Sequence, residues 1–166
     1  MYPNRDTIEF MASLRLGQFA PNFTLTTQDG HLFTLSDAIK QSPVVLVFYT
    51  MDSSPNCSRL LCRINADLST FRRANLQLVG INHAEPGTHL RTATRKFLRL
   101  PLLSDEQFKV ARAYNSVFEI GPIKVIRYSV VGIDQKGMII YLQSGRPSNE
   151  TIIAGMNATT LVTPSK

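Results

Sequence analysis

Residues 44–62 read VVLVFYTMDSSPNCSRLLC, and this stretch decides the fold. Its first five residues are all apolar, which is typical of a strand buried on both faces of a parallel sheet. After a short polar loop, Ser54 suits the capping position of a helix and Pro55 suits the first helical position. Cys57 then falls in the first turn, where free backbone N–H groups and the helix dipole favour an anion. The thiolate is the reactive form of cysteine, so the stretch predicts a reactive thiol.

Hydrophobic periodicity predicts further elements on both sides of this stretch. Residues 23–26 and 31–34 alternate with period two around Gln28-Asp29-Gly30, which indicates a hairpin. The i, i+3, i+4 pattern predicts one amphipathic helix from Pro55 to about Arg73. The other predicted elements are a short helix ending at Lys40, a strand at 76–81, a helix at 88–99, an extended piece at 101–105, a helix at 106–114, a turn at 121–122, paired strands at 126–134 and 137–143, and a helix of about ten residues capped by Ser148.

The order of these elements mixes crossover helices with antiparallel hairpins. It predicts an α/β fold with a mixed central β-sheet flanked by helices and an N-terminal β-hairpin, such as the thioredoxin-like fold. We expect one domain over residues 14–158, preceded by an irregular arm at 1–13 and followed by a polar tail at 159–166.

The composition indicates an ordinary globular protein with its own core. The chain has 166 residues, of which 43% are hydrophobic and 18% charged. Two cysteines are too few for a disulfide scaffold, and the apolar runs are too short to span a bilayer. The N-terminal residues lack the apolar core of a signal peptide, so we expect a cytoplasmic protein with reduced thiols and no membrane contact.

The net charge of +6 does not by itself indicate a nucleic-acid-binding protein. The basic residues are scattered, and aromatic residues do not interleave with them as in nucleic-acid-reading motifs. The charge can still favour an acidic partner protein. The three histidines are dispersed and do not give the ligand spacing of a zinc site with the two cysteines, so we expect no metal and no cofactor.

Several stretches together resemble a known family. They are Gly17 to Leu25 (GQFAPNFTL), which is similar to the family's opening G-x-x-A-P-D-F-x-L, then Leu102 to Asp105, Arg127, residues 133–137, and His89 at the start of its helix. On these residues the chain resembles a peroxiredoxin of the bacterioferritin-comigratory or Q-type group.

The resemblance extends from about Leu14 to Gly155 and includes the active-site motif. The family's P-x-x-x-T/S-x-x-C reads TMDSSPNC here, so that Ser54 and Cys57 match the motif. Thr50 departs from it, because the family has a proline there that shields the cysteine. Cys57 and Cys62 form the C-x4-C pair of the Q-type group, with the peroxidatic and the resolving cysteine in one helix.

The resemblance implies a thiol-dependent peroxidase that reduces hydrogen peroxide or alkyl hydroperoxides. Cys57 is then the nucleophile, with Ser54 within hydrogen-bond reach and Arg127 as a permanent cation that polarises the peroxide. The backbone N–H groups of Asn56 and Cys57 complete the oxygen cradle. Cys62 converts the sulfenic acid of Cys57 into an intramolecular disulfide, which thioredoxin or a similar dithiol reduces. The same resemblance favours a monomer.

Helix geometry adds an expectation about the disulfide. In an intact helix, Cα atoms five residues apart lie roughly 8–9 Å from each other, whereas a disulfide needs less than about 7 Å. We therefore expect local unfolding around residues 55–62 on oxidation, and unchanged amide exchange in this segment would contradict it.

Two other functions fit the same fold. A thiol–disulfide oxidoreductase is one, although that class prefers C-x2-C spacing. The other is a redox sensor or binding protein in which Thr50 has weakened turnover. His89 is expected at the helix start, on the surface or near the pocket.

Overall fold

The computed structural model describes residues 14–52 and 54–160, apart from the side chains of residues 56–58, 159 and 160. The predicted arm at 1–13 and the last residues of the predicted tail, 161–166, lie outside this description. Within the described part, seven strands form one mixed sheet in the order β2-β1-β5-β4-β3-β8-β9. They are β1 (Thr24–Thr27), β2 (Leu32–Thr34), β3 (Val44–Phe48), β4 (Gln77–Asn82), β5 (Leu102–Ser104), β8 (Ser129–Ile133) and β9 (Ile139–Ser144).

Strand β3 lies inside this sheet and is buried along its whole length, as its apolar run predicts. It pairs in parallel with β4, with Phe48 opposite Ile81, and antiparallel with β8, with Phe48 opposite Ser129. Because β3 and β4 are parallel, the polar residues that follow both strands meet at one edge of the sheet. The candidate site is built at this edge.

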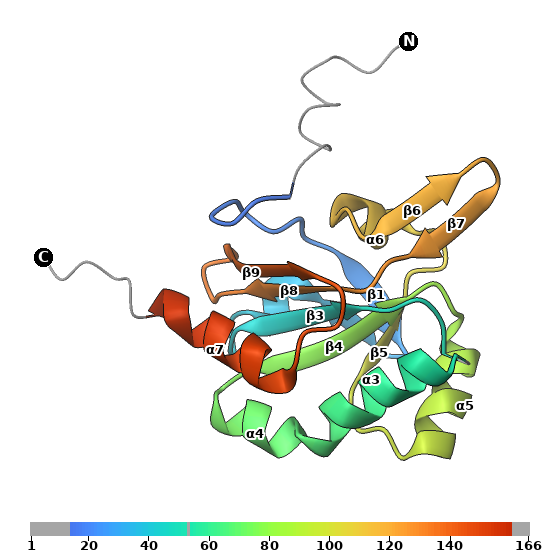
Figure 1. Ribbon diagram of the computed structural model, residues 1–166, viewed down its shortest axis with the longest axis horizontal. Helices are drawn as coiled ribbons and strands as arrows, with labels where there is room; N and C mark the ends of the chain where they lie inside the picture. Colours follow the sequence, from blue (N-terminus) through green and yellow to red (C-terminus); the bar gives the residue numbers. More distant parts are fainter. Residues whose placement is uncertain (1–13, 53, 161–166) are drawn as a thin grey trace, which may run out of the picture.

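Helices cover both faces of the sheet (Figure 1). They are α2 (Leu35–Ala38), α3 (Pro55–Ala66), α4 (Leu68–Arg73), α5 (Pro86–Lys96), α6 (Lys109–Ala113) and α7 (Asn149–Thr160). Figure 1 shows α3, α4, α5 and α7 on one side of the sheet, where Leu61 and Ile64 of α3 are fully buried. On the opposite face Phe48 packs against Tyr114, which follows α6. The two cores make a three-layer arrangement, so the predicted mixed α/β fold is confirmed.

The single helix predicted over residues 55–73 is wrong, because the structure breaks it at Asp67. In a continuous helix the carbonyl of Arg63 would accept the N–H of Asp67. Instead it accepts Nδ2 of Asn149 at 3.2 Å, while the Asp67 N–H donates to the carbonyl of Ile64 at 3.1 Å. The same Nδ2 of Asn149 donates to the Asp67 carboxylate at 2.6 Å. Asn149, at the start of α7, therefore bonds to the carbonyl that would otherwise continue α3 into α4.

The predicted N-terminal hairpin and the cap of the last helix are confirmed. Strands β1 and β2 pair antiparallel, and Gly30 takes the left-handed backbone that the turn between them needs, at φ 80°. The Ser148 hydroxyl accepts the N–H of Thr151 at 3.1 Å, which is the bond of a helix cap. Helix α7 extends to Thr160 and so enters the first residues of the predicted tail.

One hairpin was missing from the sequence prediction, which has only a turn at residues 121–122. The structure has β6 (Val117–Ile120) and β7 (Ile123–Ile126) as a separate two-stranded sheet. Ile120 and Ile123 are exposed beside the turn, so alternate residues do not bury one face and the period-two signal is lost. In the described part of the chain, no helix has the length and apolar character needed to cross a membrane.

Candidate active site

The loop at the carboxyl end of β3 places the predicted nucleophile. Strand β3 ends at Phe48, and α3 begins at Pro55 as predicted. Cys57 therefore lies in the first turn of α3, although its side chain is outside the described part of the structure. Ser54 is half-buried and directly precedes the helix. The backbone thus has the strand, loop and helix start that the sequence predicts.

Cys62 lies on the solvent side of α3 as an exposed free thiol. Its neighbours Leu60, Leu61 and Ile64 point the other way, into the core. Helix α3 runs without interruption from Pro55 to Ala66. The structure therefore shows the closed helix, and the predicted opening on oxidation stays a prediction.

Arg127 lies between β7 and β8, exposed and beside the loop that follows β3. Its backbone N–H donates to the carbonyl of Ser116 at 2.8 Å, and Nη2 donates to the carbonyl of Asn115 at 3.3 Å. Arg127 and Thr50 line one cavity of about 390 Å³. The structure therefore brings the predicted arginine to the loop that carries the motif.

Thr50 stands where the motif has proline, and its side chain has a defined contact. Its hydroxyl donates to the carbonyl of Ile126 at 3.0 Å, one residue before Arg127. Proline has no hydrogen-bond donor and could not make this bond. The threonine thus ties the loop after β3 to the segment that presents Arg127.

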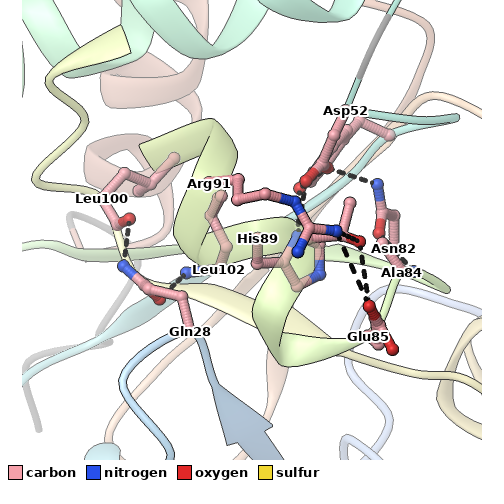
Figure 2. Close-up of polar contacts among 11 residues, drawn as sticks. Gln28, Asp52, Asn82, Ala84, Glu85, His89, Arg91, Leu100 and Leu102 are labelled. Carbon is pink, nitrogen blue, oxygen red and sulfur yellow. Dashed lines mark hydrogen bonds and ion pairs between the residues drawn. The ribbon is translucent and has the colours of Figure 1, made fainter. Parts of the chain in front are cut away.

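Sequence reasoning missed a buried polar network under the same loop. Asp52 is 5% exposed, and its carboxylate accepts hydrogen bonds from several buried side chains. Oδ1 accepts the Tyr49 hydroxyl and Nδ2 of Asn82, each at 2.8 Å, and Oδ2 lies 2.9 Å from Nδ1 of His89. Figure 2 shows Asp52 bonded to Asn82, with His89 of α5 nearby. The Oδ1 atom of Asn82 in turn accepts the N–H of Ala84 at 2.8 Å.

The network keeps Asp52 ionised. Burial by itself would raise the pKa of Asp52, but the hydrogen bond and charge of His89 and the hydrogen bonds of Tyr49 and Thr92 hold it below the ordinary value. An ionised carboxylate only accepts, so Nδ1 of His89 carries the proton of their shared hydrogen bond. Within the described residues, Nε2 of His89 has no hydrogen-bond partner.

Two positions are predicted for His89, on the surface or near the pocket. The surface position is wrong, because the ring is fully buried. The sequence did contain a signal for this network. Asp52 follows the buried strand β3, and Asn82 is the last residue of the buried strand β4, which is parallel to β3. Polar residues at such adjacent ends lie at one edge of a sheet. In the part of the chain that the structure describes, no three His, Cys, Asp or Glu side chains lie close enough together to hold a metal ion.

Comparison with known proteins gives consistent matches. The AhpC/TSA family profile matches residues 16–142. Peroxiredoxin Q, chloroplastic, of Populus jackii is 33% identical over 128 residues, which cover 77% of this chain and 59% of that protein. Putative peroxiredoxin bcp of Helicobacter pylori is 34% identical over 106 residues, 64% of this chain and 69% of that protein. The chain thus spans less than two thirds of the length of the plant relative.

The fold has close counterparts among solved structures. Peroxidoxin BcpB from Mycobacterium tuberculosis superposes with a TM-score of 0.82, covering 88% of this chain and 98% of that one. The two sequences are 23% identical. At this identity the likeness concerns the fold, and it agrees with the mixed sheet and its flanking helices.

Proposed function

Because the chain belongs to the AhpC/TSA family, we propose that it is a thiol-dependent peroxidase of the peroxiredoxin Q type, acting on hydrogen peroxide or alkyl hydroperoxides. The observation that carries the proposal is the position of Cys57 in the first turn of α3, directly after a buried strand. The helix N-terminus favours the thiolate at this position. Arg127 supports the proposal because its segment is tied to the same loop through Thr50.

The reaction begins when the Cys57 thiolate attacks one peroxide oxygen. The S–O bond forms as the O–O bond breaks, and the second oxygen leaves as hydroxide or alkoxide and takes up a proton. Cys57 is then a sulfenic acid, oxidised by two electrons. Arg127 supplies positive charge and Ser54 a hydroxyl donor, while the backbone N–H groups of residues 56 and 57 stabilise the departing negative charge.

Cys62 acts in the second step. Its thiolate attacks the sulfenic sulfur of Cys57, the disulfide forms and water leaves. The exposure of Cys62 supports this role, because its sulfur does not have to leave the core. Leu60 and Leu61 are buried, however, and each side chain drawn out of the core costs about 1.5–3 kcal/mol. Opening of the helix should therefore be partial, brief or coupled to disulfide formation.

We place the enzyme in the cytoplasm as a monomer, with a peroxide as substrate and thioredoxin or a similar dithiol as reductant. A cytoplasmic setting keeps both thiols reduced between turnovers. Sedimentation of the reduced and oxidised protein measures the oligomeric state, and a stable dimer in both forms would contradict the monomer.

A coupled assay tests the function. Loss of NADPH is followed with thioredoxin, its reductase and peroxide, comparing wild type with Cys57→Ser. We expect peroxide-dependent turnover in wild type and none in the variant. Turnover retained in Cys57→Ser would refute the proposal. Insulin reduction without peroxidase turnover would instead identify a thiol–disulfide oxidoreductase.

A further inference from the structure

The outer surface of α3 and α5 carries positive charge without any acidic residue. Residues 55–66 and 86–100 contain no Asp or Glu. Apart from Lys96, which is half-buried, their basic residues are all exposed. The residues called the basic face below are Arg59, Arg91, Arg95, Lys96 and Arg99, whereas Arg63 donates to the carbonyl of Pro147 before α7. Part of the chain's positive charge thus lies beside the predicted disulfide.

Asn65, three residues from Cys62, joins α3 to the segment that follows α5. Its Nδ2 donates to the carbonyl of Phe97 at 3.2 Å, and its Oδ1 accepts the N–H of Arg99 at 2.6 Å. Cys62 and Asn65 are three residues apart on α3, where Cβ atoms lie about 5–6 Å from each other. The end of α5 therefore lies within about one helical turn of the exposed Cys62.

At its other end the basic face reaches the loop before Cys57. A cleft of about 320 Å³ lies between this loop and α5. Met51 and Asp52 line it from the loop, and Arg91 and Arg95 line it from α5. The basic face thus borders the loop before Cys57 at one end and the part of α3 around Cys62 at the other.

Two arginines of α5, Arg91 and Arg95, carry like charges on one side of the helix. Arg91 and Arg95 are four residues apart, a spacing at which like charges destabilise a helix. Arg91 lies 3.7 Å from Glu85, which caps the start of α5, and Figure 2 shows this contact. Arg95 has no ion pair with any described carboxylate. An acidic surface brought against α5 would relieve this repulsion.

Phe97 adds an apolar contact to the basic face. Its side chain is 85% exposed, and its backbone is left-handed at φ 52°. Helices usually place glycine at such a terminal position, and a bulky residue with this φ is uncommon. The conformation costs energy and the exposed ring contributes no burial. The exposed ring is therefore accessible for contact with another molecule.

We propose that the basic face and Phe97 form the docking surface for the reductant, a dithiol protein with acidic residues around an apolar contact at its reactive cysteine. The inference rests on the proposed peroxidase function. A reductant thiolate attacks the Cys62 sulfur, the Cys57–Cys62 bond breaks, and Cys57 leaves as a thiolate that takes up a proton. The second reductant thiol then attacks the mixed disulfide and releases Cys62. The reductant dithiol is oxidised to a disulfide and supplies both electrons and both protons.

The test compares Arg95→Glu and Phe97→Ser with wild type. The reductants are a thioredoxin of net negative charge and uncharged dithiothreitol. Lys136→Glu is the matched control, because it is exposed and lies in the turn between β8 and β9. That turn is at the opposite end of the sheet, since Ile133 pairs with Val44 at the start of β3. The readout is the ratio of kcat/KM for thioredoxin to that for dithiothreitol.

At low salt, Arg95→Glu should lower this ratio about tenfold, and the effect should fall below about twofold near 0.5 M salt because exposed charges are screened. Phe97→Ser should lower the ratio about fivefold at both salt concentrations, since apolar contact is not screened. Unchanged ratios in both variants would overturn the inference, as would an equal loss in Lys136→Glu. Salt-dependent binding of single-stranded DNA that requires Arg95, with unchanged thioredoxin kinetics, would also overturn it. Wild-type turnover of hydrogen peroxide with dithiothreitol tests the peroxidase function separately.

Discussion

Replacing Asp52 by alanine should strongly destabilise the reduced protein. The change removes the common acceptor of Tyr49, Asn82 and His89, whose polar side chains are all buried. Each buried donor left unpaired costs about 1–3 kcal/mol, and this change leaves several of them unpaired. We therefore expect the free energy of unfolding to fall by about 3–5 kcal/mol and Tm to fall by about 10 °C.

Urea unfolding followed by circular dichroism measures this change. The matched control is Asp29→Ala, in the exposed turn between β1 and β2, which should change stability by less than about 0.5 kcal/mol. If Asp52→Ala does not fold, Asp52→Asn is measured instead. This variant keeps one acceptor oxygen and replaces the other oxygen by an NH₂ donor. It should lose about 1–3 kcal/mol. A loss below about 1 kcal/mol in both variants would refute the reasoning.

The pH dependence gives a second check on Asp52. Its pKa in the folded protein lies below the ordinary 3.8, because hydrogen bonds and the charge of His89 outweigh the effect of burial. The ionised carboxylate therefore contributes stability that is full above pH 3.8 and is lost as the pH falls through the lowered pKa. The difference between wild type and Asp52→Ala should shrink over this acidic range. A difference that stays constant down to the acid transition would contradict the network as described.

Three further predictions concern Arg127, Thr50 and the start of α3. Arg127→Ala should slow Cys57 oxidation by peroxide roughly 100-fold in stopped flow, with partial recovery in Arg127→Lys, and an unchanged rate would contradict the role of the guanidinium. Thr50→Val keeps the side-chain shape but leaves the Ile126 carbonyl without its donor. It should reduce the free energy of unfolding in urea by about 1 kcal/mol, and wild-type stability would show that the bond contributes nothing. Oxidation by one equivalent of peroxide should speed amide exchange at the start of α3, but not in Cys62→Ser; equal exchange in both would rule out opening driven by the disulfide.

Local patterns were sufficient to predict the elements that lead to the site. The all-apolar run at residues 44–48 identified β3, because a strand buried on both faces has no polar positions. Pro55 located the start of α3, since its fixed φ and missing N–H suit the first helical turn. The position of Cys57 in that turn follows from these two signals alone.

Contacts between distant residues decided what the local patterns could not show. The Asn149 side chain donates a hydrogen bond to the Arg63 carbonyl where α3 ends, although the hydrophobic periodicity of residues 55–73 is continuous. Similarly, Asp52 meets His89 only because β3 and β4 are parallel and α5 packs against their sheet. In both cases the partners are far apart in the chain, and their pairing depends on the completed sheet.

The sequence by itself therefore determined a strand, a helix start and a thiol placed where a thiolate is favoured. These properties depend on neighbouring residues, whose backbone preferences are local. The tertiary structure alone decided that Thr50 bonds to Ile126 and that the exposed Phe97 is held against α3 through Asn65. It did so because burial and hydrogen bonding between separate elements are settled only when the sheet and its helices pack together.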